Sequence, residues 1–150
     1  MKRTSTEVPA HFDLFVDSAG FIAVMNDRDP AHEKEIELWN LSIETGKLLV
    51  TSNFVIGETY TWMRYRKNPH IRQQAFSFLE LLDQIQPPVL TIIQVSASVD
   101  KQTSKLLKKY RDLPLSYCDA TSIVLADQFG VDQIFTFDQH FLAAGKVIKP

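Results

Sequence analysis

Four carboxylates, Asp17, Glu58, Asp119 and Asp138, are spaced so that one folded domain could bring them together. Asp17 and Asp138 each end a short apolar run of strand type, and sites in parallel sheets form just beyond the carboxyl ends of the strands. Asp119 begins an apolar helical run, and a helix that follows a strand starts at that same edge. Four clustered like charges would raise one another's pKa values, and a divalent cation is the usual remedy. Oxygen ligands without soft donors suit Mg²⁺ or Mn²⁺, which can activate water against a phosphodiester.

Each acid also has a structural alternative. Ser116 and Asp119 have the spacing of a capping box, in which the acid bonds back to the first residue of the cap. Asp17 and Asp138 could cap the helices that follow them. Glu58 falls on the apolar stripe of its predicted helix, where a charge is costly unless it is paired or binds a metal. Alternatively, Glu58 lies at the edge of the stripe and reaches water.

The elements that must position these acids alternate between strands and helices. This alternation predicts an α/β fold with a central, mainly parallel sheet flanked by helices on both sides. Ser52 or Asn53, Asn68, Ser96 and Ser116 are predicted helix caps, and Pro69 suits a first helical position. Strands are predicted over 12–17, 48–51, 89–95, 134–137 and 147–148; helices over 18–24, 31–47, 53–66, from 69 to the prolines at 87 and 88, over 97–110 and 117–129, and in a short segment ending near 144.

Composition bounds the class of protein. The chain has 150 residues, which suits one domain, and we expect a flexible tail over 1–11 followed by a single domain over 12–150. The net charge is −2, so no overall basic field indicates nucleic acid. Cys118 is the only cysteine, which excludes an intrachain disulfide and disfavours a cysteine-based zinc site. No apolar run is long enough to span a bilayer and the first residues lack a signal peptide, so we expect a cytoplasmic protein with no membrane partner.

Four short motifs occur in order along the chain: Phe15-Val16-Asp17-Ser18, Ile56-Gly57-Glu58, Leu115-Ser116-Tyr117-Cys118-Asp119-Ala120 and Phe135-Thr136-Phe137-Asp138-Gln139-His140-Phe141. Together they resemble the PIN-domain ribonucleases, particularly the VapC-type toxins of toxin–antitoxin pairs. The resemblance implies a PIN-like fold and an acidic quartet of Asp17, Glu58, Asp119 and Asp138 that holds Mg²⁺ or Mn²⁺, supported by Ser18 and Thr136.

The function that the resemblance implies is a metal-dependent endoribonuclease, the toxin of a pair with a small antitoxin protein, acting on RNA as a homodimer. One alternative is a housekeeping RNA or DNA nuclease with the same acidic site. Another is a non-catalytic PIN-like binding module that uses the acidic groove for a basic peptide.

Two basic clusters are candidate RNA contacts. The first is Arg64, Arg66, Lys67 and Arg72, at the junction of two predicted helices, and the second includes Lys105 and Lys109 on a later helix. Either cluster could instead be an ordinary solvated surface. Phe76 falls off the apolar face of its helix and is a candidate contact for a protein partner.

Overall fold

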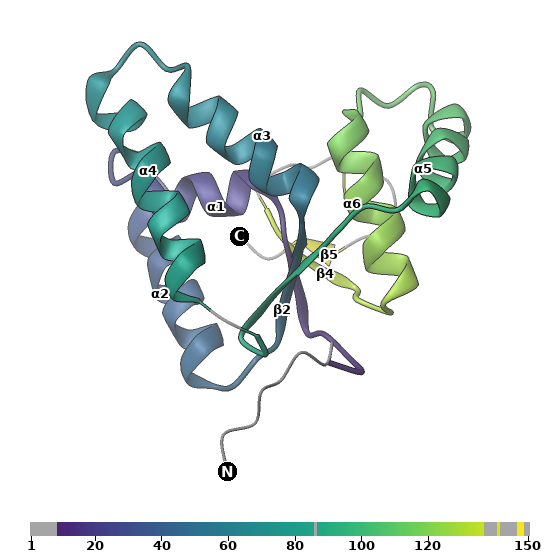
Figure 1. The fold of residues 1–150 in the computed structure, drawn as a ribbon, viewed down its shortest axis with the longest axis horizontal. Coiled ribbons are helices and arrows are strands. Elements are labelled where there is room, and N and C mark those ends of the chain that lie inside the picture. Colours follow the sequence, from purple (N-terminus) through teal and green to yellow (C-terminus); the bar gives the residue numbers. More distant parts are fainter. Residues whose placement is uncertain (1–8, 86, 137–140, 142–146, 149–150) are drawn as a thin grey trace.

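The computed structural model describes residues 9–85, 87–136, 141 and 147–148. Five strands form one sheet in the order β3-β2-β1-β4-β5, and every pairing is parallel (Figure 1). The strands are β1 (Leu14–Val16), β2 (Leu49–Ser52), β3 (Leu90–Ile93), β4 (Gln133–Phe135) and β5 (Val147–Ile148). The predicted α/β fold with a mainly parallel sheet is confirmed, including the edge strand at 147–148. Most of the predicted tail over 1–11 lies outside the described residues, so that boundary stays a prediction.

The order of the strands reverses at the centre of the sheet. The chain steps outward from β1 to β2 and β3 and then returns to place β4 on the other side of β1. Because such crossovers are right-handed, helices of the outward steps cover one face and those of the return cover the other. The first group is α1 (Ser18–Met25), α2 (His32–Glu44), α3 (Asn53–Arg64) and α4 (Pro69–Gln84), and the second is α5 (Ala97–Lys109) and α6 (Tyr117–Gln128), as Figure 1 shows. The reversal between β1 and β4 is where parallel sheets bind ligands.

The helices begin where the sequence predicted. The side chains of Ser52, Asn68, Ser96 and Ser116 each accept a hydrogen bond from a backbone N–H in the first turn. Each side chain thereby satisfies an amide that the helix itself leaves without a partner. The last predicted helix, up to residue 144, lies outside the described ranges apart from Phe141.

The inner face of α2 centres on Trp39, whose ring contacts Phe21 and Phe135. Ile36 and Ile43 pack against the core beside it and are partly buried. Glu35 and Ser42 are the other buried residues of the helix.

Gly20 allows α1 to lie directly on β4. A Cβ atom at this position would collide with the ring and the carbonyl oxygen of Phe135. The same carbonyl accepts a hydrogen bond from the backbone N–H of Asp17, at 3.2 Å. The missing side chain therefore fixes how α1 and its preceding acid sit against the neighbouring strand.

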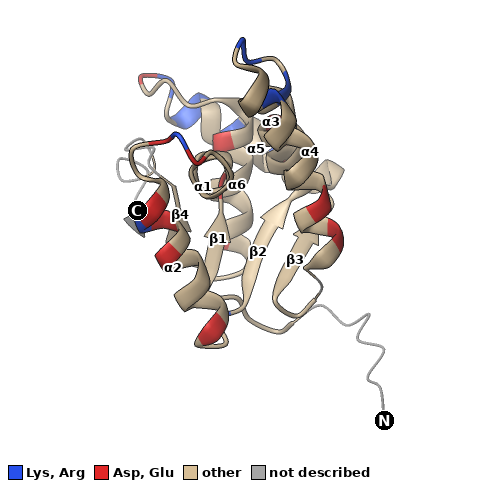
Figure 2. Ribbon diagram, turned by 90° about the vertical axis from the view of Figure 1, so that its left-hand side faces the viewer, with Lys and Arg blue, Asp and Glu red and all other residues tan. Residues whose placement is uncertain are grey.

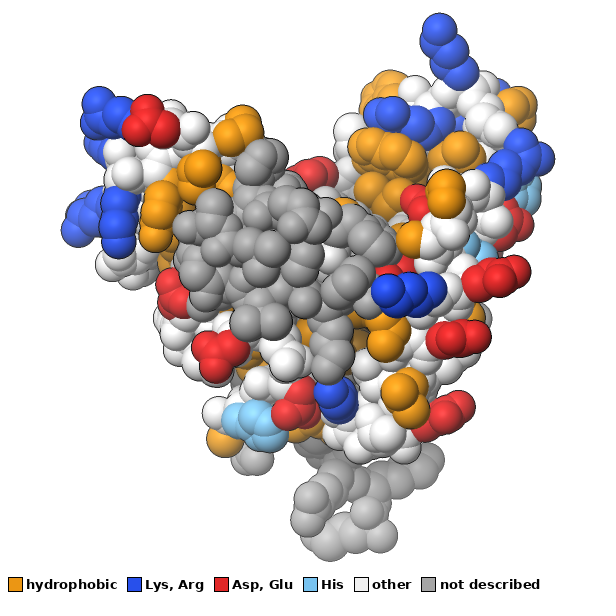
Figure 3. Space-filling model, turned by 180° about the vertical axis from the view of Figure 1, so that it is seen from behind, with side chains coloured by type: hydrophobic (Ala, Val, Ile, Leu, Met, Phe, Trp, Pro, Cys, Tyr) orange, Lys and Arg blue, Asp and Glu red, His pale blue; other side chains and the backbone are white. Residues whose placement is uncertain are grey.

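Charge is distributed unevenly over the molecule. Many of the Lys and Arg residues lie in the ribbon at the end toward which the strands point, around the tips of the helices, as Figure 2 shows. The space-filling view in Figure 3 shows two arms separated by a notch at that end, with cationic side chains on both arms. One arm carries the α3–α4 turn and the other carries α5 and α6.

Candidate active site

Asp17 directly follows β1 and is almost completely buried, with 2% of its surface exposed. Its Oδ2 accepts a hydrogen bond of 3.0 Å from the hydroxyl of Thr136, whereas its Oδ1 is buried without a hydrogen-bond partner. The side chain makes no capping bond to α1, so the capping alternative for Asp17 is wrong. A buried carboxylate oxygen without a partner is energetically costly, which marks this atom as a place for a cation or a proton.

Several groups act on the pKa of Asp17, and they raise it to about 7 from its ordinary 3.8. Burial contributes most because it disfavours the charged form, and the negative charge of Asp119 comes next. Glu58 adds a smaller contribution in the same direction, while the backbone N–H of Ser18 and the Thr136 hydroxyl oppose the rise. The carboxylates of Asp119 on α6 and Glu58 on α3 therefore both act on Asp17.

Asp119 is 8% exposed and takes part in the capping box at the start of α6. Ser116 Oγ accepts from the Asp119 N–H at 3.0 Å, and Asp119 Oδ2 accepts from the Ser116 N–H at 3.0 Å. The structural alternative for Asp119 is thus present, and it coexists with the charge interaction with Asp17. The cap holds the carboxylate at the mouth of the helix, beside the end of β1.

Glu58 lies on α3 and is half-buried, rather than sealed in the apolar face of the helix. Its Oε1 accepts a hydrogen bond of 3.2 Å from the hydroxyl of Ser18. The Cys118 thiol also donates to this carboxylate, and burial, followed by Glu58, Asp17 and Asp119, raises the pKa of that thiol well above its ordinary range. Cys118 therefore stays protonated and acts as a hydrogen-bond donor within the site.

The cysteine contact was missed from the sequence. Cys118 was considered only as a partner for disulfides or zinc, although it directly precedes Asp119. Its contact with Glu58 depends on how α6 packs against α3, which the spacing of residues along the chain does not reveal.

The fourth predicted acid, Asp138, lies outside the described residues. Within the described ranges, no group of three or more His, Cys, Asp or Glu side chains is arranged to hold a metal ion. The charges of Asp119 and Glu58 nevertheless act on Asp17, and these three residues are here called the acidic cluster. The hydroxyl of Thr136 donates a hydrogen bond to Asp17 and that of Ser18 donates one to Glu58, while their supporting role in catalysis stays a prediction.

The predicted RNA contacts divide between the two arms. On the α3–α4 turn, Arg66 lies over the Trp62 ring at 4.2 Å, and Arg72 Nη1 donates to the carbonyls of Arg66 and Lys67. Arg64 lies over the Phe76 ring at 5.1 Å. On the other arm, Lys105 and Lys109 line a groove of about 580 Å³ between α5 and α6. Arg72 thus stabilises the turn itself, while Arg64, Arg66 and Lys67 remain exposed on it.

No helix among the described residues is long and apolar enough to cross a membrane.

Comparison with known proteins identifies the family. The PIN domain profile matches residues 14–147. The chain is 29% identical over 138 residues to the 23S rRNA-specific endonuclease VapC20 of Mycobacterium tuberculosis, covering 91% of this chain and 98% of that protein. The crystal structure of VapC20, described as a Sarcin-Ricin loop cleaving toxin, superposes with a TM-score of 0.77 at 27% identity, over 90% of this chain and 97% of that one.

A more distant structure shares the fold alone. VapBC2 from Rickettsia felis, bound to a DNA fragment from its promoter, superposes with a TM-score of 0.64 at 15% identity, over 92% of this chain and 98% of that one. The match of the family profile extends over nearly the whole described fold, from β1 to β5. This chain belongs to the PIN-domain family.

Proposed function

We propose that this protein is a metal-dependent endoribonuclease that acts as the toxin of a toxin–antitoxin pair. The observation that carries the proposal is the buried Oδ1 of Asp17, which lacks a hydrogen-bond partner and lies in the field of Asp119 and Glu58. A site with this charge and this desolvation is suited to a divalent cation.

The donor set fits Mg²⁺ or Mn²⁺. Asp17, Asp119 and Glu58 offer carboxylate oxygens, which hard cations prefer, and Asp138 would complete the set by its place in the sequence. When bound, such an ion activates water and offsets negative charge on a phosphodiester undergoing in-line attack.

The residues around the acidic cluster keep its members in place. Thr136 donates to Asp17, the capping box fixes Asp119, and Ser18 and Cys118 donate to Glu58. Thr136 follows β4, Ser18 begins α1 and Cys118 lies on α6. Asp17 and Glu58 are therefore held by donors from other elements, and Asp119 is held at the start of its own helix. Rigid placement of charged groups is what electrostatic catalysis requires.

The proposed substrate is RNA because VapC20 is a 23S rRNA-specific endonuclease and resembles this chain over almost its full length. Cationic side chains on both arms could contact the phosphates of the strand, which would make binding depend on salt.

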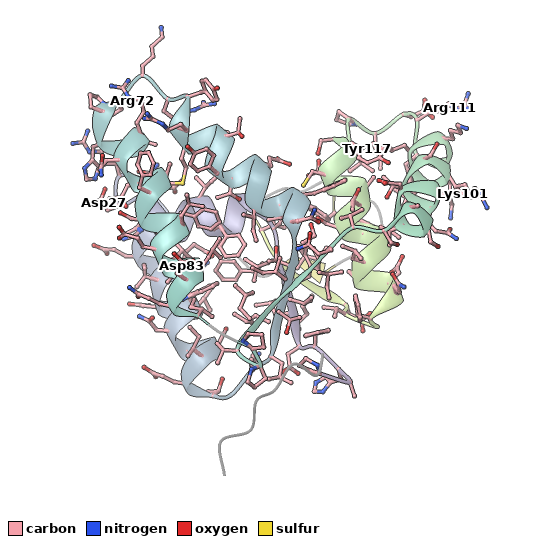
Figure 4. All side chains as sticks on the ribbon, viewed as in Figure 1. Asp27, Arg72, Asp83, Lys101, Arg111 and Tyr117 are labelled. Atoms are coloured by element: carbon pink, nitrogen blue, oxygen red, sulfur yellow. The ribbon has the colours of Figure 1, made fainter. Side chains whose placement is uncertain are left out.

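Cleavage of single-stranded RNA tests this proposal directly. The wild-type chain should cut in Mg²⁺ or Mn²⁺ and stop in excess EDTA, and Asp17→Asn should not cut in either metal. Asp83→Asn, an exposed acid on α4, is the matched control and should cut normally (Figure 4). Undiminished cleavage in EDTA, or by Asp17→Asn, would refute the metal-dependent mechanism.

We further propose that a small antitoxin covers the α4 side of the α3–α4 arm. Phe76 and Leu79 are large apolar side chains on α4 with 39% and 37% of their surfaces exposed. An arginine from the partner could also pair with the acidic cluster, since guanidinium and carboxylate groups form strong charge-assisted bonds.

Expression in the native host tests the pairing. The wild-type chain alone should arrest growth, and Asp17→Asn or co-expression of an adjacent small gene product should relieve the arrest. A stable complex should co-purify, and Phe76→Ser with Leu79→Ser should weaken it. Unaffected growth with no co-purifying protein would favour the housekeeping nuclease. The homodimer stays a prediction, which light scattering on the purified chain can check.

A further inference from the structure

A shallow pocket of about 370 Å³ lies on the α5–α6 arm and is separate from the groove that holds Lys105 and Lys109. Three of its lining residues lie on α5, one lies in the turn that follows, and one begins α6. The lining residues are Ser104, Leu107, Lys108, Arg111 and Tyr117. One aromatic ring, two cations and a hydroxyl together complement the base and the phosphate of a nucleotide.

Tyr117 is held in place although its side chain is exposed. Its hydroxyl donates to Asp100 Oδ1 on α5 at 2.8 Å, and its ring contacts Phe54 of α3 with a centroid distance of 6.2 Å. The residue is nonetheless 44% exposed. A ring fixed at both ends and still open to solvent can stack against a base with little loss of side-chain entropy.

The two cations at the pocket are also available to a ligand. Arg111 Nε donates to the Lys108 carbonyl at 3.2 Å, which holds the guanidinium at the end of α5. Both side chains are exposed, and the ion pairs found among the described residues involve neither of them. Figure 4 shows Arg111 at the tip of the same arm whose inner side carries Tyr117, while Lys101 points outward from α5.

The pocket adjoins the acidic cluster through two elements. Tyr117 stands two residues before Asp119 on α6, and its neighbour Phe54 stands four residues before Glu58 on α3. The pocket and the acidic cluster therefore share the start of α6 and the α3 helix that contacts it.

We infer that the pocket binds one nucleotide of single-stranded RNA next to the phosphodiester that the acidic cluster acts on. The base stacks on Tyr117, and Lys108 and Arg111 contact a phosphate. This inference rests on the proposed function and adds to it a requirement for an unpaired base, because a stacked ring is accessible only outside a duplex.

Equilibrium binding tests the inference without catalysis. The probe is a fluorescein-labelled single-stranded RNA of mixed sequence, measured by anisotropy with the full chain in EDTA. Tyr117→Leu should weaken binding roughly tenfold, within the range that one base stack contributes. Tyr117→Phe keeps the ring and should stay within about twofold of the wild type. Leu41→Ala, which removes an exposed apolar side chain on α2 away from both arms, is the control.

The cations have their own readout. Lys108→Ala with Arg111→Ala should lower the slope of log K against log salt by about 0.7, the value expected for the loss of one phosphate contact on a single strand. Lys101→Ala is the control on the same helix. Both pocket side chains are exposed, so the double variant should fold even if Tyr117→Leu does not.

The outcomes separate the two proposals. Wild-type binding with equal effects of Tyr117→Leu and Leu41→Ala, or with an unchanged salt slope in the double variant, overturns the nucleotide pocket and leaves the nuclease standing. A wild-type chain that binds no RNA in EDTA also overturns the pocket, whereas the cleavage assay in Mg²⁺ or Mn²⁺ decides the nuclease.

Discussion

Asp17 and Glu35 are both buried carboxylates whose pKa lies near 7, yet their surroundings differ. Asp17 is 2% exposed, and its pKa is raised by burial and then by Asp119. Glu35, on α2, is 0% exposed, and burial raises its pKa to about 7 while Lys34 lowers it and Asp29 raises it slightly. Both Glu35 oxygens are buried without a hydrogen-bond partner.

The difference teaches that burial alone does not make an acid functional. Asp17 shares its site with two further carboxylates, so a divalent cation can relieve the burial and the repulsion together. Among the described residues, the charges that act on Glu35 are Lys34, which lowers its pKa, and Asp29, which raises it, so a proton rather than a divalent cation fits this site. The same pKa therefore indicates a ligand site in one region and a stability cost in the other.

The largest expected contrast is in catalysis. Asp17→Asn should reduce RNA cleavage by at least a hundredfold, because a metal ligand supplies several kcal/mol of transition-state stabilisation. Glu35→Gln should stay within about twofold of the wild type when both are assayed at the same temperature and pH. Equal losses in the two variants would show that Asp17, like Glu35, matters only for folding.

The second contrast is in the pH dependence of stability. The folded chain keeps the Glu35 proton up to about pH 7, whereas the unfolded chain releases it near 4.5. Folding stability therefore falls as pH rises through this window, by up to about 3 kcal/mol for this group. Glu35→Gln should match the wild type near pH 4 and exceed its free energy of unfolding by up to about 3 kcal/mol at pH 8.

Denaturant titrations in EDTA at several pH values check this expectation. Part of the fall in folding stability with rising pH should persist in Glu35→Gln, because Asp17 loses its proton over the same pH range in the metal-free protein. A variant as pH-sensitive as the wild type would mean that Glu35 contributes nothing to the decline.

A third test uses the metal itself. At a hundred times its dissociation constant, Mg²⁺ or Mn²⁺ should raise the free energy of unfolding by about 2.7 kcal/mol through mass action. Thermal melts should show this gain in the wild type and in Glu35→Gln but not in Asp17→Asn. Retention of the shift in Asp17→Asn would place the ion elsewhere.

The smallest effect concerns Glu58. It contributes least to the raised pKa of Asp17, so Glu58→Gln should stabilise the metal-free protein by well under about 1 kcal/mol while weakening metal binding. Calorimetric titration with Mn²⁺, with Glu80→Gln on α4 as the exposed control, measures the second effect. Lower stability with unchanged Mn²⁺ binding would make Glu58 a structural acid.

The fold was largely predictable because its signals are local. Ser52, Asn68, Ser96 and Ser116 start helices through bonds within one turn, so sequence spacing locates them. The strand ends were less accurate, since a strand exists only where another strand pairs with it. Asp13, for example, bonds to Leu48 yet lies just outside β1.

The positions of the acids in the candidate site could be predicted from the sequence, whereas the contacts that hold Glu58 could not. The ends of strands and the starts of helices place Asp17 and Asp119 at one edge, and the structure brings them together. The contacts of Glu58 with Ser18 and Cys118 depend on packing between helices far apart in the sequence. Glu35 was missed because a glutamate is ordinarily exposed, although its spacing of four from Trp39 carried the signal.

Gly20 imposes a restriction on how this sequence can vary. Its backbone touches Phe135, whose carbonyl also binds the N–H of Asp17, so any side chain there would push α1 away from the strand and carry the acid with it. Thr136 adjoins that same strand residue and would lose its reach to Asp17. A library that randomises position 20 and selects for nuclease activity should return glycine almost alone, even though Gly20 contacts neither metal nor RNA in the proposed mechanism.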